Sequence, residues 1–134
     1  MLLQVGVKVL IQNRSGKYLF IQRSKIMDGE TSVSWDIPGG RISPDETLYE
    51  GLARELNEEI GLTDTIPEPQ LLAAQDIIVK AKDLHVVRLT YRINCDLKMI
   101  RLSDEHSDYR WVGLGETEDM LIEPNLKEVF TRFG

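Results

Sequence analysis

The sequence predicts an α/β protein, a sandwich in which helices cover a mixed β-sheet. Three observations predict it: residues 5–11 alternate apolar and polar as a strand does, residues 44–60 form one long amphipathic helix, and residues 125–133 have helical apolar spacing. Strands lie before and after the long helix, which is typical of layered α/β folds. With 134 residues and no linker or repeat, we expect one domain over residues 1–134.

The chain begins with two predicted strands. Residues 5–11 carry a valine or isoleucine at every second position, and the polar residues 13–16 read as a turn. Residues 18–21 are apolar on both faces, so we expect a central strand that ends near Arg23.

A polar segment separates these strands from the next apolar residues. Residues 25–34 are irregular, with Asp28-Gly29 as a turn signal, and we interpret them as a mobile loop that borders a pocket. Trp35 follows, and we expect it in the core, with a stacking platform for a nucleobase as the alternative.

The second half of the chain predicts three further strands. Residues 70–79 and 84–95 form two strands around a turn at 80–83, and a loop over 97–108 leads to a short strand at 109–112. Alternation over 84–95 predicts one buried face and one polar face, and we expect the polar face to be solvated rather than to line a pocket. The predicted buried face comprises Val87, Leu89, Tyr91, Ile93 and Cys95, and the polar face Arg88, Thr90, Arg92 and Asn94.

The long helix has clear signals at both ends. Ser43 as N-cap, Pro44 at the first helical position and Glu46 three residues after Ser43 form the pattern of a capping box. Gly61 is placed to end the helix in a left-handed conformation. At 100° per residue one apolar arc faces the core. It comprises Leu48, Tyr49, Leu52, Ala53, Leu56 and Ile60.

Three glutamates lie at the margin of that apolar arc instead of opposite it. Glu59 projects between two of its leucines, and Glu55 and Glu58 share its flank. A solvated acidic face would place these side chains on the far side of the helix. Carboxylates pressed together beside an apolar surface need a positive charge, and Arg54 can neutralise only one of them. Mg²⁺ or Mn²⁺ would serve, and these ions commonly bind substrate phosphates as well.

These residues resemble a known motif. Gly40, five residues, Glu46, seven residues, and then RELNEEIGL over residues 54–62 resemble the Nudix box of the Nudix hydrolases, with every defining position filled. Residues 35–39 and 105–112 are also similar to that family, so the resemblance spans most of the chain.

The resemblance implies a fold, a reaction and a metal site. The fold is the Nudix-type α/β/α sandwich with a mixed β-sheet. The reaction is hydrolysis of a nucleoside diphosphate linked to another group, by attack of water on a phosphorus of the pyrophosphate. The metal ligands are the Gly40 carbonyl and the carboxylates of Glu55, Glu58 and Glu59, which would hold one or more Mg²⁺ or Mn²⁺ ions.

The resemblance also implies catalytic roles. Arg54 would orient a catalytic glutamate through a salt bridge. Glu55 or Glu58 could act as the general base, but in several members of the family a loop outside the box supplies it, and Glu105 is our candidate here. An ordinary loop acid is the alternative for Glu105, and His106 beside it is a weaker candidate for substrate contact.

Three further residues are assigned to substrate binding. By resemblance Arg23 faces the substrate phosphates, with a simple charge at a strand end as the equal alternative. Gly39 precedes the helix together with Gly40, and such a pair allows close approach of the main chain to a ligand. Arg41 completes the set. For Glu46 we favour helix capping over metal ligation.

Composition limits the partners. The formal charge is -6 with no basic run, which argues against broad binding to nucleic acid or anionic membranes. Cys95 is the single cysteine, so no internal disulfide forms, and no apolar run approaches membrane-spanning length. We expect a cytoplasmic protein that binds a small-molecule nucleotide. A homodimer is compatible with the sequence, which does not set the oligomeric state.

The substrate is predicted by elimination. The positions downstream of the box that mark ADP-ribose or dinucleoside polyphosphate hydrolases fall at 77–80 and carry neither signature, and the coenzyme A and NADH signatures are also absent. A nucleoside triphosphate, ordinary, deoxy or oxidised, is therefore our hypothesis. The main alternative is a Nudix-fold module that senses a nucleotide without cleaving it. A calcium-binding acidic helix and an isomerase are less favoured.

Overall fold

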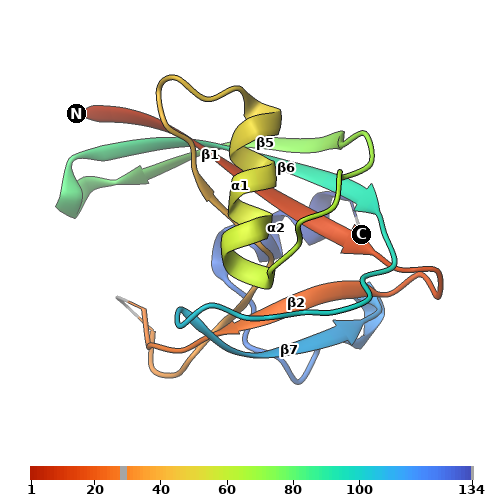
Figure 1. Cartoon of the computed structure of the whole chain (residues 1–134). Coiled ribbons are helices and arrows are strands. Elements are labelled where there is room, and N and C mark those ends of the chain that lie inside the picture. The colour runs from red at the N-terminus through yellow and green to blue at the C-terminus, as the bar shows by residue number, and fades with distance from the viewer. Residues whose placement is uncertain (28–29, 134) are drawn as a thin grey trace.

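The computed structural model describes residues 1–27 and 30–133, and within them seven strands form one mixed sheet with a helix on each face (Figure 1). The strands are β1 (Leu2–Gln12), β2 (Tyr18–Arg23), β3 (Trp35–Asp36), β4 (Gly39–Arg41), β5 (Gln70–Val79), β6 (Leu84–Asn94) and β7 (His106–Val112). The helices are α1 (Leu48–Ile60) and α2 (Pro124–Phe133), with short 3₁₀ turns η1 (Lys80–Lys82) and η2 (Leu114–Glu116). The predicted α/β sandwich is confirmed. No helix in the described ranges is long and apolar enough to cross a membrane.

Strand β1 organises the sheet. It runs parallel to β6 along its whole length, from Leu2 opposite Leu84 to Gln12 opposite Asn94. It also pairs antiparallel with β2 and with β4, while β7 adds to the other side of β2 and β5 adds to β6. Parallel neighbours so far apart in sequence require a crossover connection, and α1 lies in it.

Two apolar clusters hold the helices to the two faces of the sheet. On one face the α1 residues Leu52, Leu56 and Ile60 pack against alternate residues of β1, including Val9. On the other face α2 packs through Leu126, joined by residues of β1, β2 and β3. Trp35 belongs to this second cluster and is 5% exposed, which confirms its prediction as a core residue.

The predicted start of the long helix is wrong by four residues. Helix α1 begins at Leu48, and Thr47 is its N-cap in a capping box with Glu50. The Ser43 turn does form, because Ser43 N–H donates to Glu46 Oε1 at 2.8 Å, but it closes a separate turn. Arg54 holds the Glu46 carboxylate beside the helix, so the second capping box of the same sequence type begins α1. The predicted stop is confirmed, since Gly61 has φ 75°.

Other expectations need smaller corrections. Leu48 and Tyr49 in the first turn of α1 are exposed instead of joining the apolar arc. In β6 the predicted polar face contains Thr90, which is 1% exposed, while Val87 on the predicted buried face is only half-buried. Strand β7 begins at His106, earlier than expected. The predicted turn at residues 28–29 lies outside the described residues.

Gly39 allows β4 to lie directly against β1. Its φ is +145°, and a Cβ at this position would lie 2.0 Å from the Val7 carbonyl oxygen. We predict that Gly39→Ala lowers the free energy of unfolding by about 3 kcal/mol or more, because a strained backbone angle and a steric clash act together. Urea denaturation measures the change.

The matched control is Gly115→Ala, where an added Cβ meets nothing within 4 Å. We expect it to change the free energy of unfolding little. Equal stability of the two variants would contradict the close packing of β4 on β1.

Candidate active site

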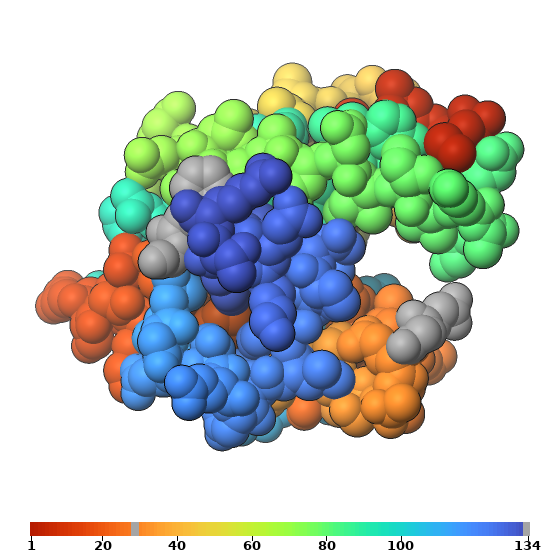
Figure 2. All heavy atoms as spheres, turned by 180° about the vertical axis from the view of Figure 1, so that it is seen from behind, coloured from red at the N-terminus to blue at the C-terminus, as the bar shows by residue number. Residues whose placement is uncertain are grey.

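A cleft of about 960 Å³ lies along one side of the sheet. One end is formed by α1, β4 and the turn before β7, and the other by β5, β6 and the start of α2. Seen from behind, it opens between the β5–β6 hairpin and the segment before β3 (Figure 2). Met27 and Glu30 line it, as expected for the segment 25–34 as a border of a pocket.

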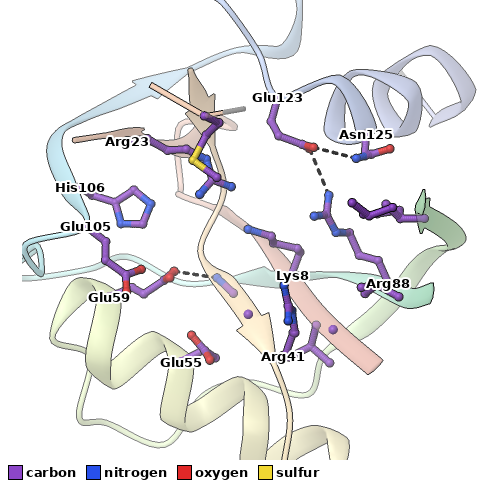
Figure 3. Close-up of a pocket in the computed structure, with 18 of the residues that line it drawn as sticks. Lys8, Arg23, Arg41, Glu55, Glu59, Arg88, Glu105, His106, Glu123 and Asn125 are labelled. Carbon is purple, nitrogen blue, oxygen red and sulfur yellow. Dashed lines mark hydrogen bonds and ion pairs between the residues drawn. The ribbon is translucent and has the colours of Figure 1, made fainter. Parts of the chain in front are cut away.

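The three glutamates predicted as metal ligands all line this cleft. Glu55 and Glu59 are buried, and Glu58 is exposed at the mouth. Glu59 is fixed by Gly39, whose N–H donates to Glu59 Oε1 at 2.8 Å (Figure 3). The Gly39 N–H therefore orients a carboxylate, and contact of substrate with this glycine, which lines the cleft, stays a prediction.

Arg54 connects the acidic side chains on α1. Its guanidinium forms ion pairs with Glu46 at 2.6 Å, Glu55 at 3.1 Å and Glu58 at 3.2 Å. The predicted salt bridge from Arg54 to a box glutamate is thus present. The hydrogen bonds from Arg54 lower the pKa of Glu46 to about 2. The favoured capping contact of Glu46 also exists, through the Ser43 N–H, although it does not cap α1 itself.

Burial leaves two carboxylates short of positive charge. Desolvation raises the pKa of Glu59 to about 7, although Lys8 and the Gly39 N–H act in the opposite direction. Burial also raises the pKa of Glu55. A divalent cation beside these oxygens would supply the missing charge, so the donor set fits Mg²⁺ or Mn²⁺.

The main chain of Gly40 lies directly against this donor set. A Cβ on Gly40 would lie 2.6 Å from Glu55 Oε1, so only glycine fits here without displacing the carboxylate. A main-chain carbonyl and carboxylate oxygens are hard ligands of one kind, and the grouping of the Gly40 carbonyl with the glutamates stays a prediction.

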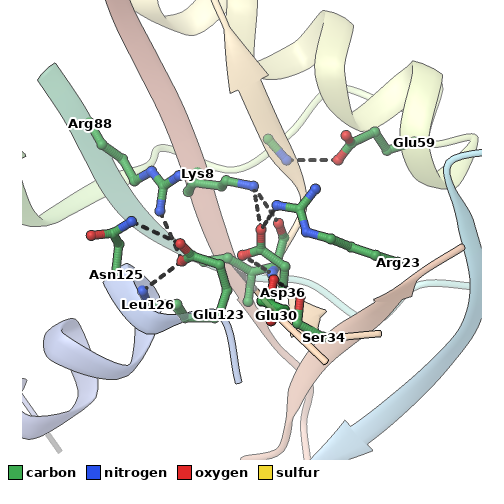
Figure 4. A network of polar contacts seen from close by, with 12 residues as sticks. Lys8, Arg23, Glu30, Ser34, Asp36, Glu59, Arg88, Glu123, Asn125 and Leu126 are labelled. Atoms are coloured by element: carbon green, nitrogen blue, oxygen red, sulfur yellow. Dashed lines mark hydrogen bonds and ion pairs between the residues drawn. The ribbon is translucent and has the colours of Figure 1, made fainter. Parts of the chain in front are cut away.

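Two cations of the cleft share one buried aspartate (Figure 4). Lys8 Nζ lies 2.9 Å from Asp36 Oδ2, and Arg23 pairs with the same oxygen. Burial acts to raise the pKa of Asp36, but the charges of Lys8 and Arg23 outweigh it and hold the pKa below its usual value. Arg23 is therefore more than a charge at a strand end, because it lines the cleft next to Lys8.

Lys8 and Asp36 were missed in the sequence. Lys8 lies between buried valines of a central strand, yet alternation alone assigned it to a polar face. A lysine flanked by such residues in a strand buried on both faces was the available signal. Asp36 gave a similar signal, because it is a charged residue between the apolar residues Trp35 and Ile37.

The far end of the cleft has a second polar group. Arg88 Nη1 donates to Glu123 Oε2 at 3.1 Å, and Asn125 Nδ2 donates to Glu123 Oε1 at 2.9 Å. Glu123 also accepts the Leu126 N–H at 2.8 Å, which caps α2. The expectation that the polar face of β6 is solvated is wrong for Arg88, because α2 covers the sheet there and closes the cleft.

Glu105 and His106 lie beside the C-terminal end of α1, at the same end of the cleft. Each offers one ligand atom that lies within 4.8 Å of the other and of one from Glu59. Desolvation lowers the pKa of His106 to about 4, with Lys8 and Arg23 acting in the same direction. Arg41 also lines the cleft, and its Nη1 donates to Gln4 Oε1 at 2.7 Å.

Comparison with known proteins gives consistent matches. The family model described as NUDIX domain matches residues 2–133. The chain is 38% identical over 64 residues to a CTP pyrophosphohydrolase of Escherichia coli K12, covering 48% of this chain and 46% of that protein. It is 29% identical over 113 residues to the nucleoside triphosphatase NudI of the same strain, covering 77% of each.

The chain spans about a quarter to a half of the length of the first curated relatives that it matches. Among solved structures, a MutT protein from Methanosarcina mazei Go1 superposes with a TM-score of 0.81 at 30% identity, covering 98% of this chain and 92% of that one. The family model covers nearly the whole chain, and we conclude that this protein belongs to the NUDIX domain family.

Proposed function

We propose that this protein hydrolyses a nucleoside triphosphate, ordinary, deoxy or oxidised, to a nucleoside monophosphate and pyrophosphate. Water adds to a phosphorus atom, and the anhydride bond to the neighbouring phosphate breaks. One observation supports this most: a single cleft holds Glu55, Glu58 and Glu59 next to Lys8 and Arg23. Names of matched relatives, CTP pyrophosphohydrolase and nucleoside triphosphatase, are consistent with it.

The residues that would hold Mg²⁺ or Mn²⁺ are Glu55, Glu58, Glu59 and the Gly40 carbonyl. When bound, such ions neutralise phosphate charge and lower the pKa of a bound water. The chain itself holds the glutamates in place: Arg54 bridges Glu55 and Glu58, and the Gly39 N–H fixes Glu59.

Lys8 and Arg23 suit the phosphate end of the substrate. Both are anchored by Asp36, so their positions are set before a nucleotide arrives. Preorganised cations stabilise charge that develops on phosphate oxygens without the cost of reorganising water. Arg41 lies at the same end and extends the positive rim.

Glu105 is proposed as the general base. It is exposed at the cleft wall beside Glu59, where a water between the two carboxylates would be within reach. A carboxylate within hydrogen-bond distance of the attacking water can accept its proton. The box glutamates Glu55 and Glu58 are the alternative bases.

The opposite end of the cleft suits the nucleoside. Ile77 and Val86 form an apolar wall, while Arg88, Glu123 and Asn125 present polar groups beside it. Ligand sites combine apolar walls with a few placed polar groups in this manner, and the volume of the cleft lies in the usual range.

A nucleotide panel tests the proposal. We expect Mg²⁺-dependent release of pyrophosphate from ribo- or deoxyribonucleoside triphosphates, which EDTA abolishes and added Mg²⁺ restores. The panel includes ADP-ribose, nucleotide sugars and dinucleoside polyphosphates, whose preferential cleavage would reassign the substrate. Tight nucleotide binding without turnover on any compound would support a sensing module instead.

Glu58→Gln separates metal binding from folding. Glu58 is exposed, so the amide fits sterically, but it loses a charge from the metal set. We predict that kcat falls by roughly 10²- to 10⁴-fold with the circular dichroism spectrum unchanged. Glu68→Gln, the same change at an exposed loop position, is the control and should retain wild-type kcat.

Glu105→Gln tests the base. We predict a loss in kcat of roughly 10²- to 10⁴-fold with a smaller effect on KM, because the amide cannot accept the proton of the attacking water. Steady-state kinetics with the preferred substrate measure both constants. A near-normal kcat would return this duty to Glu55 or Glu58.

A further inference from the structure

His106 has an environment that the proposed hydrolysis does not explain. It is 7% exposed, and its Nδ1 is buried without a hydrogen-bond partner among the described residues. A buried polar atom without a partner is destabilising, so this imidazole is suited to accept a bound partner.

Two carboxylates lie next to the ring. Glu59, Glu105 and His106 each place one potential ligand atom so that all three lie within 4.8 Å of one another. Figure 3 shows the ring beside the carboxylates of Glu59 and Glu105 at the wall of the cleft. Ligands about 2.0 to 2.2 Å from a common ion lie about 3 to 4 Å apart, so a small movement of the exposed Glu105 side chain completes the set.

The backbone holds the three residues in place. Glu59 is fixed through Gly39, as described above. The Ser24 N–H donates to the Glu105 carbonyl at 2.8 Å, and the His106 N–H donates to the Ser103 carbonyl at 3.2 Å. His106 also begins β7, where it pairs with Arg23 of β2. These contacts leave little of the geometry to be ordered when an ion binds.

We propose that Glu59, Glu105 and His106 form a mixed nitrogen and oxygen site that binds a divalent transition metal ion such as Co²⁺, Ni²⁺ or Zn²⁺ in preference to Mg²⁺. Imidazole suits these ions, whereas Mg²⁺ prefers ligands that are all oxygen. The box glutamates and the Gly40 carbonyl supply only oxygen, so His106 is what distinguishes this position.

The nearby cations do not prevent such binding. Lys8 and Arg23 lie close to His106, but both are paired with Asp36. Two carboxylates of the site match the charge of a divalent ion. The site shares Glu59 with the Mg²⁺ set and Glu105 with the base proposed above, so an ion bound here withdraws Glu105 from that role. Occupation of the site does not depend on hydrolysis of any nucleotide.

Metal binding without nucleotide tests this site. The chain contains two histidines, His85 and His106, so paramagnetically shifted imidazole resonances of the Co²⁺-loaded protein can be assigned with two variants. We expect such resonances in wild type and in His85→Gln, and their loss in His106→Gln. His85 lies on β6 and contacts Asp76, which makes it a matched control.

Calorimetry gives the affinities. We expect His106→Gln to raise the Kd for Co²⁺ about tenfold or more, because loss of a direct ligand should cost at least as much as loss of a supporting residue. The Kd for Mg²⁺ should change much less. Glu105 is exposed, so Glu105→Gln should fold normally. We expect this variant to bind Co²⁺ more weakly, so that the shifted His106 resonances appear only at higher Co²⁺ concentrations.

Two outcomes would overturn the proposal. One is an unchanged Kd for Co²⁺ in both His106→Gln and Glu105→Gln. The other is an equal loss of affinity for Co²⁺ and Mg²⁺ in His106→Gln, which would show that His106 has only a structural role. Absence of nucleotide turnover with intact Co²⁺ binding through His106 would reject the proposed hydrolysis and leave this site standing.

Discussion

The structure depends on the close contact between α1 and β4. The apolar face of α1 is buried on β1, and this places Glu55 and Glu59 at the edge of a dry surface. Gly39 and Gly40 let β4 approach so closely that one donates its N–H to Glu59 and the other touches Glu55. Carboxylates that lose water in this way favour any cation that can enter. The same packing that stabilises the core therefore creates the demand for metal.

One buried acid anchors two cations of the cleft. Lys8 and Arg23 would repel each other and lose hydration if they faced the cleft alone. Asp36, fully buried beneath them, pairs with both and also accepts the Ile37 N–H at 2.8 Å. An ion network of this kind contributes little to stability by itself. Its effect is to hold two cations in fixed positions beside two desolvated glutamates.

Local signals in the sequence predicted much of the fold. The bounds of β5 and the stop at Gly61 were correct because turn residues and alternation are properties of neighbouring positions. The predicted start of α1 was wrong because two capping boxes lie in series, and in the folded protein the carboxylate of the first one, Glu46, also pairs with Arg54. That contact exists only once the helix is folded.

The positions of the box glutamates were also predictable from local sequence, because their spacing along one helix places them on a shared flank. Lys8 and Arg88 were not. They meet the cleft because β1 and β6 lie parallel with Gly6 opposite Arg88, a register between segments about eighty residues apart. No local pattern carries that register, although the apolar residues around Lys8 indicated a buried lysine. Alternation alone grouped Lys8 with polar positions and assigned Arg88 to a solvated face.

The two ends of the cleft differ in how many of their polar side chains already have hydrogen-bond or ion-pair partners within the protein. Near α1, burial leaves the carboxylates of Glu55 and Glu59 without enough positive charge nearby, so this end favours a metal ion. A metal ion in turn favours the phosphates, which all nucleotides have in common. Near α2, Glu123 is engaged by Arg88, Asn125 and the Leu126 N–H, so its orientation is fixed before a ligand enters. A base bound there must match groups whose orientation is already set, and burial of a base's own polar group without a partner costs about 1 to 3 kcal/mol. Under the proposed function, discrimination between nucleotides would therefore fall to β6 and α2, outside the box.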